Sequence, residues 1–361
     1  MRRRQADVRL IAYRGRVPAP FRRASARRFS ALLAGFAVLG LVLTACGGST
    51  KKASSPPTVS SSTAPSSSSA PASTSSSSSP AVPQTPVHLK LLNVEGATVG
   101  VGEPIVVYAS QRIPDGVSFG KATTVKINGQ VVQGGWHWEN SAQIQGYPVE
   151  GHYRAEPQPG NATPYWPAHA TIELDLKTQG VQAGPTMTFD NSLTLHFQTG
   201  AANISYVDCS AERLTPTTDG APAHAPLPTS CGAAKTPTYT GTKVVMQKGE
   251  DSPGSNALRP NGEVRMVGPG YDEIVGWSVR VTASGEYVHA ASWNGVNIGV
   301  RSTSNGCTNL NPADAQWFYS WAQLGDVLLY TNSGGSTMPS WDGLGDWNLP
   351  DSEFNNEVPD A

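Results

Sequence analysis

The sequence predicts a mainly β protein behind a long unfolded leader, and three observations carry this prediction. First, 37 glycines and 29 prolines stand against only 15% charged residues, which favours strands and turns over long surface helices. Second, from residue 86 onward, short runs alternate between apolar and polar side chains and are separated by turn residues. Third, 361 residues exceed one ordinary domain, so we expect two folded domains plus tails.

Residues 1–45 are predicted to be a lipoprotein signal peptide. Arginines crowd the start of the chain, and the uncharged apolar run Phe29–Ala45 has the length of a signal-peptide core. The run ends in "LTAC", where small residues precede Cys46 as in a bacterial lipobox, so Cys46 is the expected lipidation site. An uncleaved membrane helix is the alternative, but an apolar run of 17 residues is short for spanning a bilayer.

Residues 46–85, from the lipidated cysteine onward, are expected to form a disordered Ser/Ala/Pro linker. Such a composition has no apolar surface to bury, and a flexible chain of about 39 residues has a root-mean-square reach of roughly 35 Å. From Cys46 onward the chain holds 16 basic and 26 acidic residues. This argues against a nucleic-acid partner, because a phosphate-binding surface needs a basic face.

The block over residues 86–199 is predicted to be an immunoglobulin-like β-sandwich. Four runs suit strands with one face on a core: Glu103–Ser110, Thr123–Val132, Ala170–Thr178 and Ser192–Thr199. The second run contains the hairpin signal Asn128-Gly129. Trp136 and Trp138 are expected in the core rather than on an exposed binding platform. Three histidines lack the spacing of metal ligands and are expected to be structural: His152, His169 and His196.

A second β-rich block is expected over residues 200–332, followed by a C-terminal extension over 333–361 that packs partly on it. Strands are predicted at Asn203–Cys209, Gly241–Gln247 and Asp326–Thr331, with a hairpin over Gly276–Ala290 that turns at Ser284-Gly285. One short helix follows, with Asn311 as N-cap, Pro312 at its first position and Gly325 at its end. Its predicted apolar face holds Trp317, Phe318, Trp321 and Leu324.

Cys307 lies in the loop before this helix, and its role decides what the domain does. It can be a buried thiol, half of a disulfide, a metal ligand or a nucleophile. A metal site is disfavoured, because the cysteines do not form the close pairs typical of zinc sites. Cys209 and Cys231 flank a predicted hairpin and make the natural disulfide, although both can equally remain reduced core thiols. With those two paired, Cys307 is left over.

The neighbours of Cys307 favour a nucleophile. His289 ends a predicted strand eighteen residues upstream, and the return of the chain can bring it beside the sulfur. An imidazole that removes the thiol proton is the minimum for an activated thiolate, and the resulting ion pair would lower the thiol pKa. Gly306 permits a close backbone approach, and Asn305 and Asn309 offer polar groups.

The segment His289–Phe318, "HAASWNGVNIGVRSTSNGCTNLNPADAQWF", resembles the catalytic segment of L,D-transpeptidases with the YkuD-type fold. That family has a histidine, then about seventeen residues, then Ser/Thr-His-Gly-Cys-x-Asn. The stretches "LPTSCGAAKTPTYTG", Leu227–Gly241, and "DGLGDWN", Asp342–Asn348, are similar to mycobacterial and related actinobacterial members. In those enzymes one or two immunoglobulin-like domains precede the catalytic domain, which agrees with the predicted order here.

The resemblance assigns roles to residues of this chain. Cys307 would be the nucleophile and His289 its base, oriented by a backbone carbonyl at Ala290. Gly306 and Cys307 would give backbone N–H groups to an oxyanion, and supporting roles fall to Asn309, Asn305 and Ser304. Asn305 replaces the histidine of the family motif, and asparagine cannot titrate near neutral pH. The substrate-binding tyrosine of some family members has no evident counterpart in the sequence.

The resemblance also implies a reaction and a location. Cys307 would attack a donor stem peptide of peptidoglycan and become acylated by it, with release of D-alanine. A side-chain amine of an acceptor stem would then attack the thioester and form an L,D cross-link. Such cross-links would serve cell-wall biogenesis and the maintenance of cell shape. No metal or other cofactor is expected, and carbapenem β-lactams are expected inhibitors. The protein would be exported and lipid-anchored at Cys46 to the outer face of the cytoplasmic membrane, reaching into the wall. An L,D-carboxypeptidase, a non-catalytic wall-binding lipoprotein and a structural adhesion module are the alternatives.

Overall fold

The structure is a computed structural model that describes residues 83–358, except 142, 251–256 and 269–270. The predicted signal peptide, Cys46 and most of the linker lie outside the described residues. All described residues belong to one compact unit. Within this described part of the chain, no helix is both long enough and apolar enough to span a membrane.

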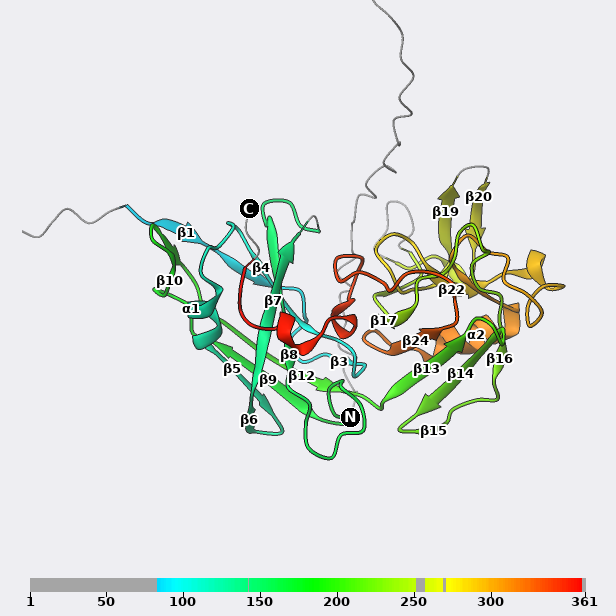
Figure 1. The fold of residues 1–361 in the computed structure, drawn as a ribbon, viewed down its shortest axis with the longest axis horizontal. Helices are drawn as coiled ribbons and strands as arrows, with labels where there is room; N and C mark the ends of the chain where they lie inside the picture. The colour runs from blue at the N-terminus through cyan, green and yellow to red at the C-terminus, as the bar shows by residue number, and fades with distance from the viewer. Residues whose placement is uncertain (1–82, 142, 251–256, 269–270, 359–361) are drawn as a thin grey trace, which may run out of the picture. The chain divides into compact units, whose positions relative to one another are not determined.

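The first block is a sandwich of mainly antiparallel sheets, as the alternating runs predict (Figure 1). One sheet has the order β2-β4-β8-β7, formed by Leu89–Leu91, Ile105–Ala109, Val149–Ala155 and Gly134–Asn140. The other has the order β3-β12-β9-β5-β6, formed by Thr98–Val99, Leu193–Thr199, Thr171–Leu176, Thr123–Ile127 and Gln130–Val132. A small third sheet joins β1, β11 and β10, at Thr85–Val87, Met187–Phe189 and Gln182–Gly184. In these sheets β3 is parallel to β12 and β1 is parallel to β11.

The core of the sandwich is aromatic. Trp136 and Trp138 are fully buried, which confirms their predicted core position. Phe119 packs edge-on against both indoles, with ring centroids 5.0 and 4.9 Å away. Phe119 comes from the short helix α1, Gly116–Lys121, which the sequence analysis did not predict. The turn at Asn128 joins β5 to β6 as expected, with positive φ at Asn128 and at the following glycine.

The second block is built on two sheets and one main helix. The larger sheet has the order β15-β14-β13-β24-β17, with β16 beside β14, from Ala221–Pro222, Arg213–Thr218, Asn203–Asp208, Val327–Thr331, Gly241–Val244 and Leu227–Pro228. The smaller has the order β18-β21-β22-β23, from Gln247–Lys248, Val279–Arg280, Tyr287–Ala290 and Thr308–Leu310. The predicted strand over 241–247 is therefore split between the two sheets.

Helix α2, Pro312–Trp321, follows β23 and ends earlier than predicted. Asn311 holds the N-cap position, but its side chain makes no capping bond. The helix stops because Ala322 is already extended, and Gly325, at φ 84°, instead forms the turn into β24. That turn packs closely on the sandwich, where Gly100 N donates to Leu324 O at 2.7 Å.

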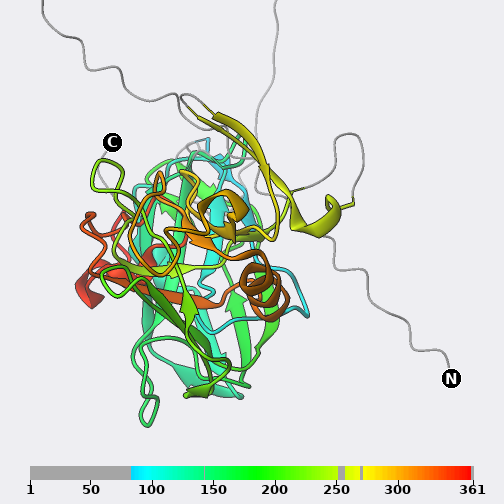
Figure 2. The same cartoon turned by 90° about the vertical axis from the view of Figure 1, so that its right-hand side faces the viewer.

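Three further features complete the described chain. The hairpin of β19, Val264–Gly268, and β20, Tyr271–Val275, extends away from the rest of the second block, in yellow in Figure 2. Four single-turn 3-10 helices, η1–η4, lie at Pro260–Gly262, Ser292–Asn294, Asp346–Asn348 and Asp351–Glu353. The C-terminal segment, residues 333–358, contacts both blocks. Asn348 Nδ2 donates to Thr242 O, and Trp347 Nε1 donates to Gly102 O, each at 2.8 Å.

Candidate active site

Two parallel strands bring the predicted nucleophile and base to one cleft. β22 pairs with β23 in parallel, so that His289 stands opposite Asn309, and Cys307 directly precedes β23. His289 and Cys307 both line a cleft of about 420 Å³. The two residues are 18 positions apart in the chain, and the pairing of the strands brings them to the same cleft.

His289 is buried, with 3% of its surface exposed, and its ring is oriented by the backbone. Nδ1 lies 2.8 Å from Ala290 O. A carbonyl oxygen only accepts hydrogen bonds, so Nδ1 carries the proton and Nε2 keeps a free lone pair. The ring also stacks on Trp293, with centroids 6.0 Å apart. His289 is therefore held in the tautomer that a general base requires.

The backbone before Cys307 needs a glycine. Gly306 has φ 118°, in the region that other residues rarely adopt, and a Cβ there would lie 3.4 Å from Glu286 Oε1. The sulfur of Cys307 lies 3.7 Å from Gly285 O, at the turn between β21 and β22. The positive φ at Gly306 thus sets the direction in which the cysteine enters the cleft.

Hydrogen bonds of Ser304 hold the loop around Cys307. Ser304 Oγ donates to Cys307 O at 2.5 Å and accepts from Gly306 N at 3.2 Å. Because Gly306 N–H is engaged in this way, it could serve an oxyanion only after exchanging that bond. Asn305 is exposed at the rim of the cleft, whereas Asn309 is buried and exchanges backbone bonds with Ser230.

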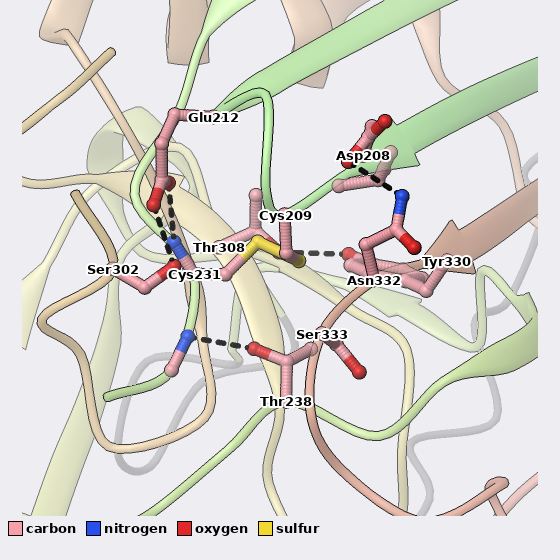
Figure 3. The surroundings of a disulfide bond; sticks show 12 residues. Asp208, Cys209, Glu212, Cys231, Thr238, Ser302, Thr308, Tyr330, Asn332 and Ser333 are labelled. Atoms are coloured by element: carbon pink, nitrogen blue, oxygen red, sulfur yellow. Dashed lines mark hydrogen bonds between the residues drawn. A yellow bond between two sulfur atoms is a disulfide. The ribbon is translucent and has the colours of Figure 1, made fainter. Parts of the chain in front are cut away.

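A disulfide joins Cys209 to Cys231 and supports the same loop (Figure 3). Cys231 O accepts from the backbone N–H groups of Thr303 and Ser304, at 2.9 and 3.0 Å. Of the two open alternatives for this cysteine pair, the structure shows the bonded one. Within the described part of the chain, Cys307 is the free cysteine.

A buried ion pair beside Cys307 was not predicted from the sequence. Lys243 Nζ donates to Glu286 Oε2, and Lys243 has no exposed surface. Its ammonium group lies 3.7 Å from the ring centroid of Tyr330. Glu286 Oε1 also accepts from Tyr239 N at 2.9 Å. The sequence contains only a weak signal for this ion pair. Lys243 is a charged residue inside the run "GTKVV", and a charged residue in such a run is usually expected to be exposed on an edge strand.

The electrostatics favour a neutral resting site. Removal from water raises the pKa of Cys307 to about 11, with a smaller lowering effect from Lys243. Burial lowers the pKa of His289 to about 4, against the effect of its bond to Ala290. This differs from the expected ion pair with a low thiol pKa, because burial penalises both charged forms. Near neutral pH the site holds a thiol and a neutral imidazole, so a nucleophilic role for Cys307 requires the thiol proton to leave during the attack.

The walls of the cleft contain residues that sequence reasoning did not place. Tyr271 and Met266 come from the β19–β20 hairpin, and Trp293 lies on η2. The sequence alone offered no candidate for a tyrosine in the site, and the structure places Tyr271 in the cleft wall. It directly follows "GPG", a strong turn signal between two alternating runs, which could have indicated the hairpin.

A cysteine just before β23 and an oriented histidine on the parallel strand β22 form an arrangement suited to acyl transfer through a thioester. Comparison with known proteins agrees with that class. Residues 202–329 match the L,D-transpeptidase catalytic domain, YkuD, and residues 58–182 match a bacterial Ig domain. The chain therefore carries a YkuD-type L,D-transpeptidase catalytic domain behind a bacterial immunoglobulin-like domain, and its relatives are mycobacterial L,D-transpeptidases.

Two relatives come from Mycobacterium tuberculosis. L,D-transpeptidase 2 of strain CDC 1551 is 30% identical over 275 residues, which cover 74% of this chain. L,D-transpeptidase 5 of strain H37Rv is 30% identical over 243 residues, which cover 66% of this chain. The chain spans 62% and 49% of the lengths of these two relatives.

Two solved structures share the fold. An L,D-transpeptidase from Mycobacterium smegmatis has a TM-score of 0.50 and 27% identity, covering 68% of this chain and all of that one. The LD transpeptidase LdtMt1, solved in complex with imipenem, has a TM-score of 0.52 and 24% identity, covering 67% of this chain and 97% of that one.

Proposed function

We propose that this protein is a peptidoglycan L,D-transpeptidase that uses Cys307 as its nucleophile. The observation that carries the proposal is the parallel pairing of β22 with β23, which puts His289 and Cys307 into one cleft. The family of residues 202–329 supports the reaction type. The substrate would be a stem peptide with an L-centre followed by D-alanine.

In the first half-reaction, Cys307 Sγ attacks the carbonyl carbon of the L-centre while its proton passes to Nε2 of His289. Because thiol and imidazole are neutral at rest, this transfer accompanies the attack. Backbone N–H groups near Cys307 stabilise the oxyanion that forms. The intermediate then expels the D-alanine nitrogen, which takes the proton from His289, and a thioester remains on Cys307.

In the second half-reaction, the side-chain amine of an acceptor stem attacks the thioester carbonyl. His289 takes a proton from the attacking amine and returns it to the departing sulfur. An amide cross-link forms and the thiol is regenerated, so atoms and charge balance without a cofactor. If water replaced the amine, the product would be a shortened stem, which product analysis with and without an acceptor stem would reveal.

Carbapenem acylation tests the assignment of the nucleophile. The imipenem complex of the related LD transpeptidase supports this choice of probe. We expect intact-protein mass spectrometry to show a mass gain of one carbapenem on the wild type and none on Cys307→Ala. The disulfide removes Cys209 and Cys231 as competing thiols. An equal mass gain in both proteins would refute the assignment.

We also propose that the protein is exported, lipidated at Cys46 and held on the outer face of the cytoplasmic membrane. The lipobox "LTAC" and the Ser-rich tether behind it support this. A diacyl anchor provides two chains, which suffice for stable attachment. We expect the wild type in the membrane fraction and Cys46→Ala in the soluble or precursor fraction. Equal fractionation of both would argue against the anchor.

A further inference from the structure

A buried cluster of acids and histidine lies on the sandwich, on the face of β7 and β8 opposite the tryptophan core. In the register of these strands, Glu139 stands directly opposite Glu150, and His152 follows two residues later on β8. Their exposed fractions are 8%, 5% and 2%. Like charges directly opposite each other destabilise a sheet, and buried carboxylates are costly unless they are compensated. A cation held between the two carboxylates would compensate their charge.

The distances within the cluster do not match hydrogen bonds. His152 Nε2 lies 3.6 Å from Glu150 Oε1 and 4.0 Å from Glu139 Oε1. Both His152 Nε2 and Glu139 Oε1 are buried without a hydrogen-bond partner. One ligand atom from each of the three residues lies within 4.8 Å of the other two. Two ligands bound to one zinc ion at about 2.0–2.2 Å each are roughly 3–4 Å apart, so these separations suit a shared ion.

The other polar atoms of these three side chains already have hydrogen-bond partners outside the cluster. His152 Nδ1 lies 2.9 and 3.0 Å from the two carboxylate oxygens of Asp346. Ser141 Oγ donates to Glu150 Oε2 at 2.6 Å, and Ser340 Oγ donates to Glu139 Oε2 at 2.8 Å. A carboxylate on Nδ1 puts the proton there and turns the lone pair of Nε2 inward, as in carboxylate–histidine–zinc arrangements.

We propose that Glu139, Glu150 and His152 bind one divalent transition-metal cation, with zinc as the best match to one imidazole and two carboxylates. The cation neutralises the two opposed carboxylates and uses the unpartnered atoms. Asp346 and Ser340 belong to the C-terminal segment, whereas the three ligands belong to the sandwich. The ion would therefore strengthen the attachment of the C-terminal segment to the sandwich, a structural role distinct from the cleft at Cys307.

Zinc binding to the full chain tests this proposal. The protein carries Cys307→Ala, so that the thiol in the cleft cannot bind the metal, and it is stripped with a chelator before calorimetric titration with Zn²⁺. We expect one equivalent to bind and to raise the melting temperature, with Mg²⁺ at least about 100-fold weaker. Added Glu139→Gln should weaken zinc binding at least about 100-fold, and Asp346→Asn by about 10–100-fold.

Glu173→Gln is the matched control, because Glu173 is a half-exposed strand glutamate of the same sandwich that pairs with Lys126 on its surface. It should bind zinc like its parent. If Glu139→Gln fails to fold, zinc-edge X-ray absorption of the parent decides alone, with only nitrogen and oxygen ligands expected. Absence of zinc uptake by the parent, sulfur ligands, or undiminished binding by folded Glu139→Gln would overturn the proposal. So would a doubly protonated His152 in excess zinc, observed by NMR.

Discussion

The thiol of Cys307 lies within reach of two opposite charges. Lys243 lowers its pKa and Glu286 raises it, while removal from water outweighs both. The two charged side chains also depend on each other, because burial disfavours an unpaired charge on either. The pair can therefore influence catalysis without touching the substrate.

Replacing Lys243 by methionine should separate these effects. Lys243→Met leaves the Glu286 carboxylate buried and alone, so we expect a loss of about 3 kcal/mol or more in the free energy of unfolding. The thiol pKa should rise further, with alkylation and acylation about tenfold slower at a given pH. Urea unfolding and the pH profile of thiol alkylation measure the two effects.

The double variant Lys243→Met/Glu286→Leu is the control, because it removes both charges. It should recover most of the stability and return the thiol pKa toward that of the wild type. An unchanged alkylation profile in Lys243→Met would mean that the ion pair only supports the fold.

The pH dependence of acylation should report His289. A base must be unprotonated, and the pKa of His289 is lowered to about 4. We therefore expect the acylation rate constant to stay level through neutral pH and to fall as pH drops through about 4, where His289 gains a proton. His289→Ala should slow acylation by about 10²–10⁴-fold, with circular dichroism unchanged. A decline centred near pH 6.5, the unperturbed histidine value, would contradict the buried environment described here.

Among the elements, the disulfide-linked segment most directly supports the catalytic loop. Cys209 and Cys231 are 22 residues apart, and Cys231 O receives two N–H groups of that loop. We expect Cys209→Ala/Cys231→Ala to lose about 3 kcal/mol of unfolding free energy, from the closed loop of this length. Acylation at Cys307 should slow as well, because Thr303 and Ser304 lose a fixed acceptor. Thermal unfolding and carbapenem kinetics under reducing and oxidising conditions test both.

Element boundaries separate what the sequence could predict from what it could not. The turn at Asn128-Gly129, the buried Trp136 and the start of α2 at Pro312 follow from local rules, because each depends on residues adjacent in the chain. The end of α2 at Trp321, where Ala322 becomes extended, does not follow from a local pattern. The turn just beyond it makes a tertiary contact instead, in which Gly100 N donates to Leu324 O. The site divides in the same way. The motif around Cys307 is contiguous, whereas Lys243 and Glu286 are 43 residues apart and meet only in the fold.

The proposed zinc ligands could not be recognised in the sequence for a related reason. From the sequence, no metal is predicted and His152 is expected to be structural. Metal spacing rules describe ligands on one turn or helix, but Glu139 comes from β7, and Glu150 and His152 from β8. Asp346, which orients His152, is 194 residues away in the chain. Only strand pairing and the return of the C-terminal segment bring these groups together.

At the scale of the whole molecule, Trp347 connects the two blocks, because the buried clusters that it packs against contain side chains of both. Besides its bond to Gly102 O, it packs edge-on against Tyr165 of the sandwich, with centroids 5.0 Å apart, and lies under the guanidinium of Arg154. We expect Trp347→Ala to cost about 3 kcal/mol and to split one calorimetric unfolding transition into two. Trp341→Ala is the control, because Trp341 is 62% exposed on the same segment, and it should change stability by less than about 0.5 kcal/mol. A single transition in both variants would show that other contacts suffice.

The position of Asp346 and Trp347 near the end of the chain also sets an order of events. Synthesis proceeds from the N-terminus, so these residues leave the ribosome, and any transport channel, after both blocks have emerged. Each block can then complete its own sheets before the groups that fasten them together become available. The contacts of Asp346 and Trp347 with the sandwich are thus among the last to form, and a chain that stops just before Asp346 would keep the sheets of both blocks but lose these contacts.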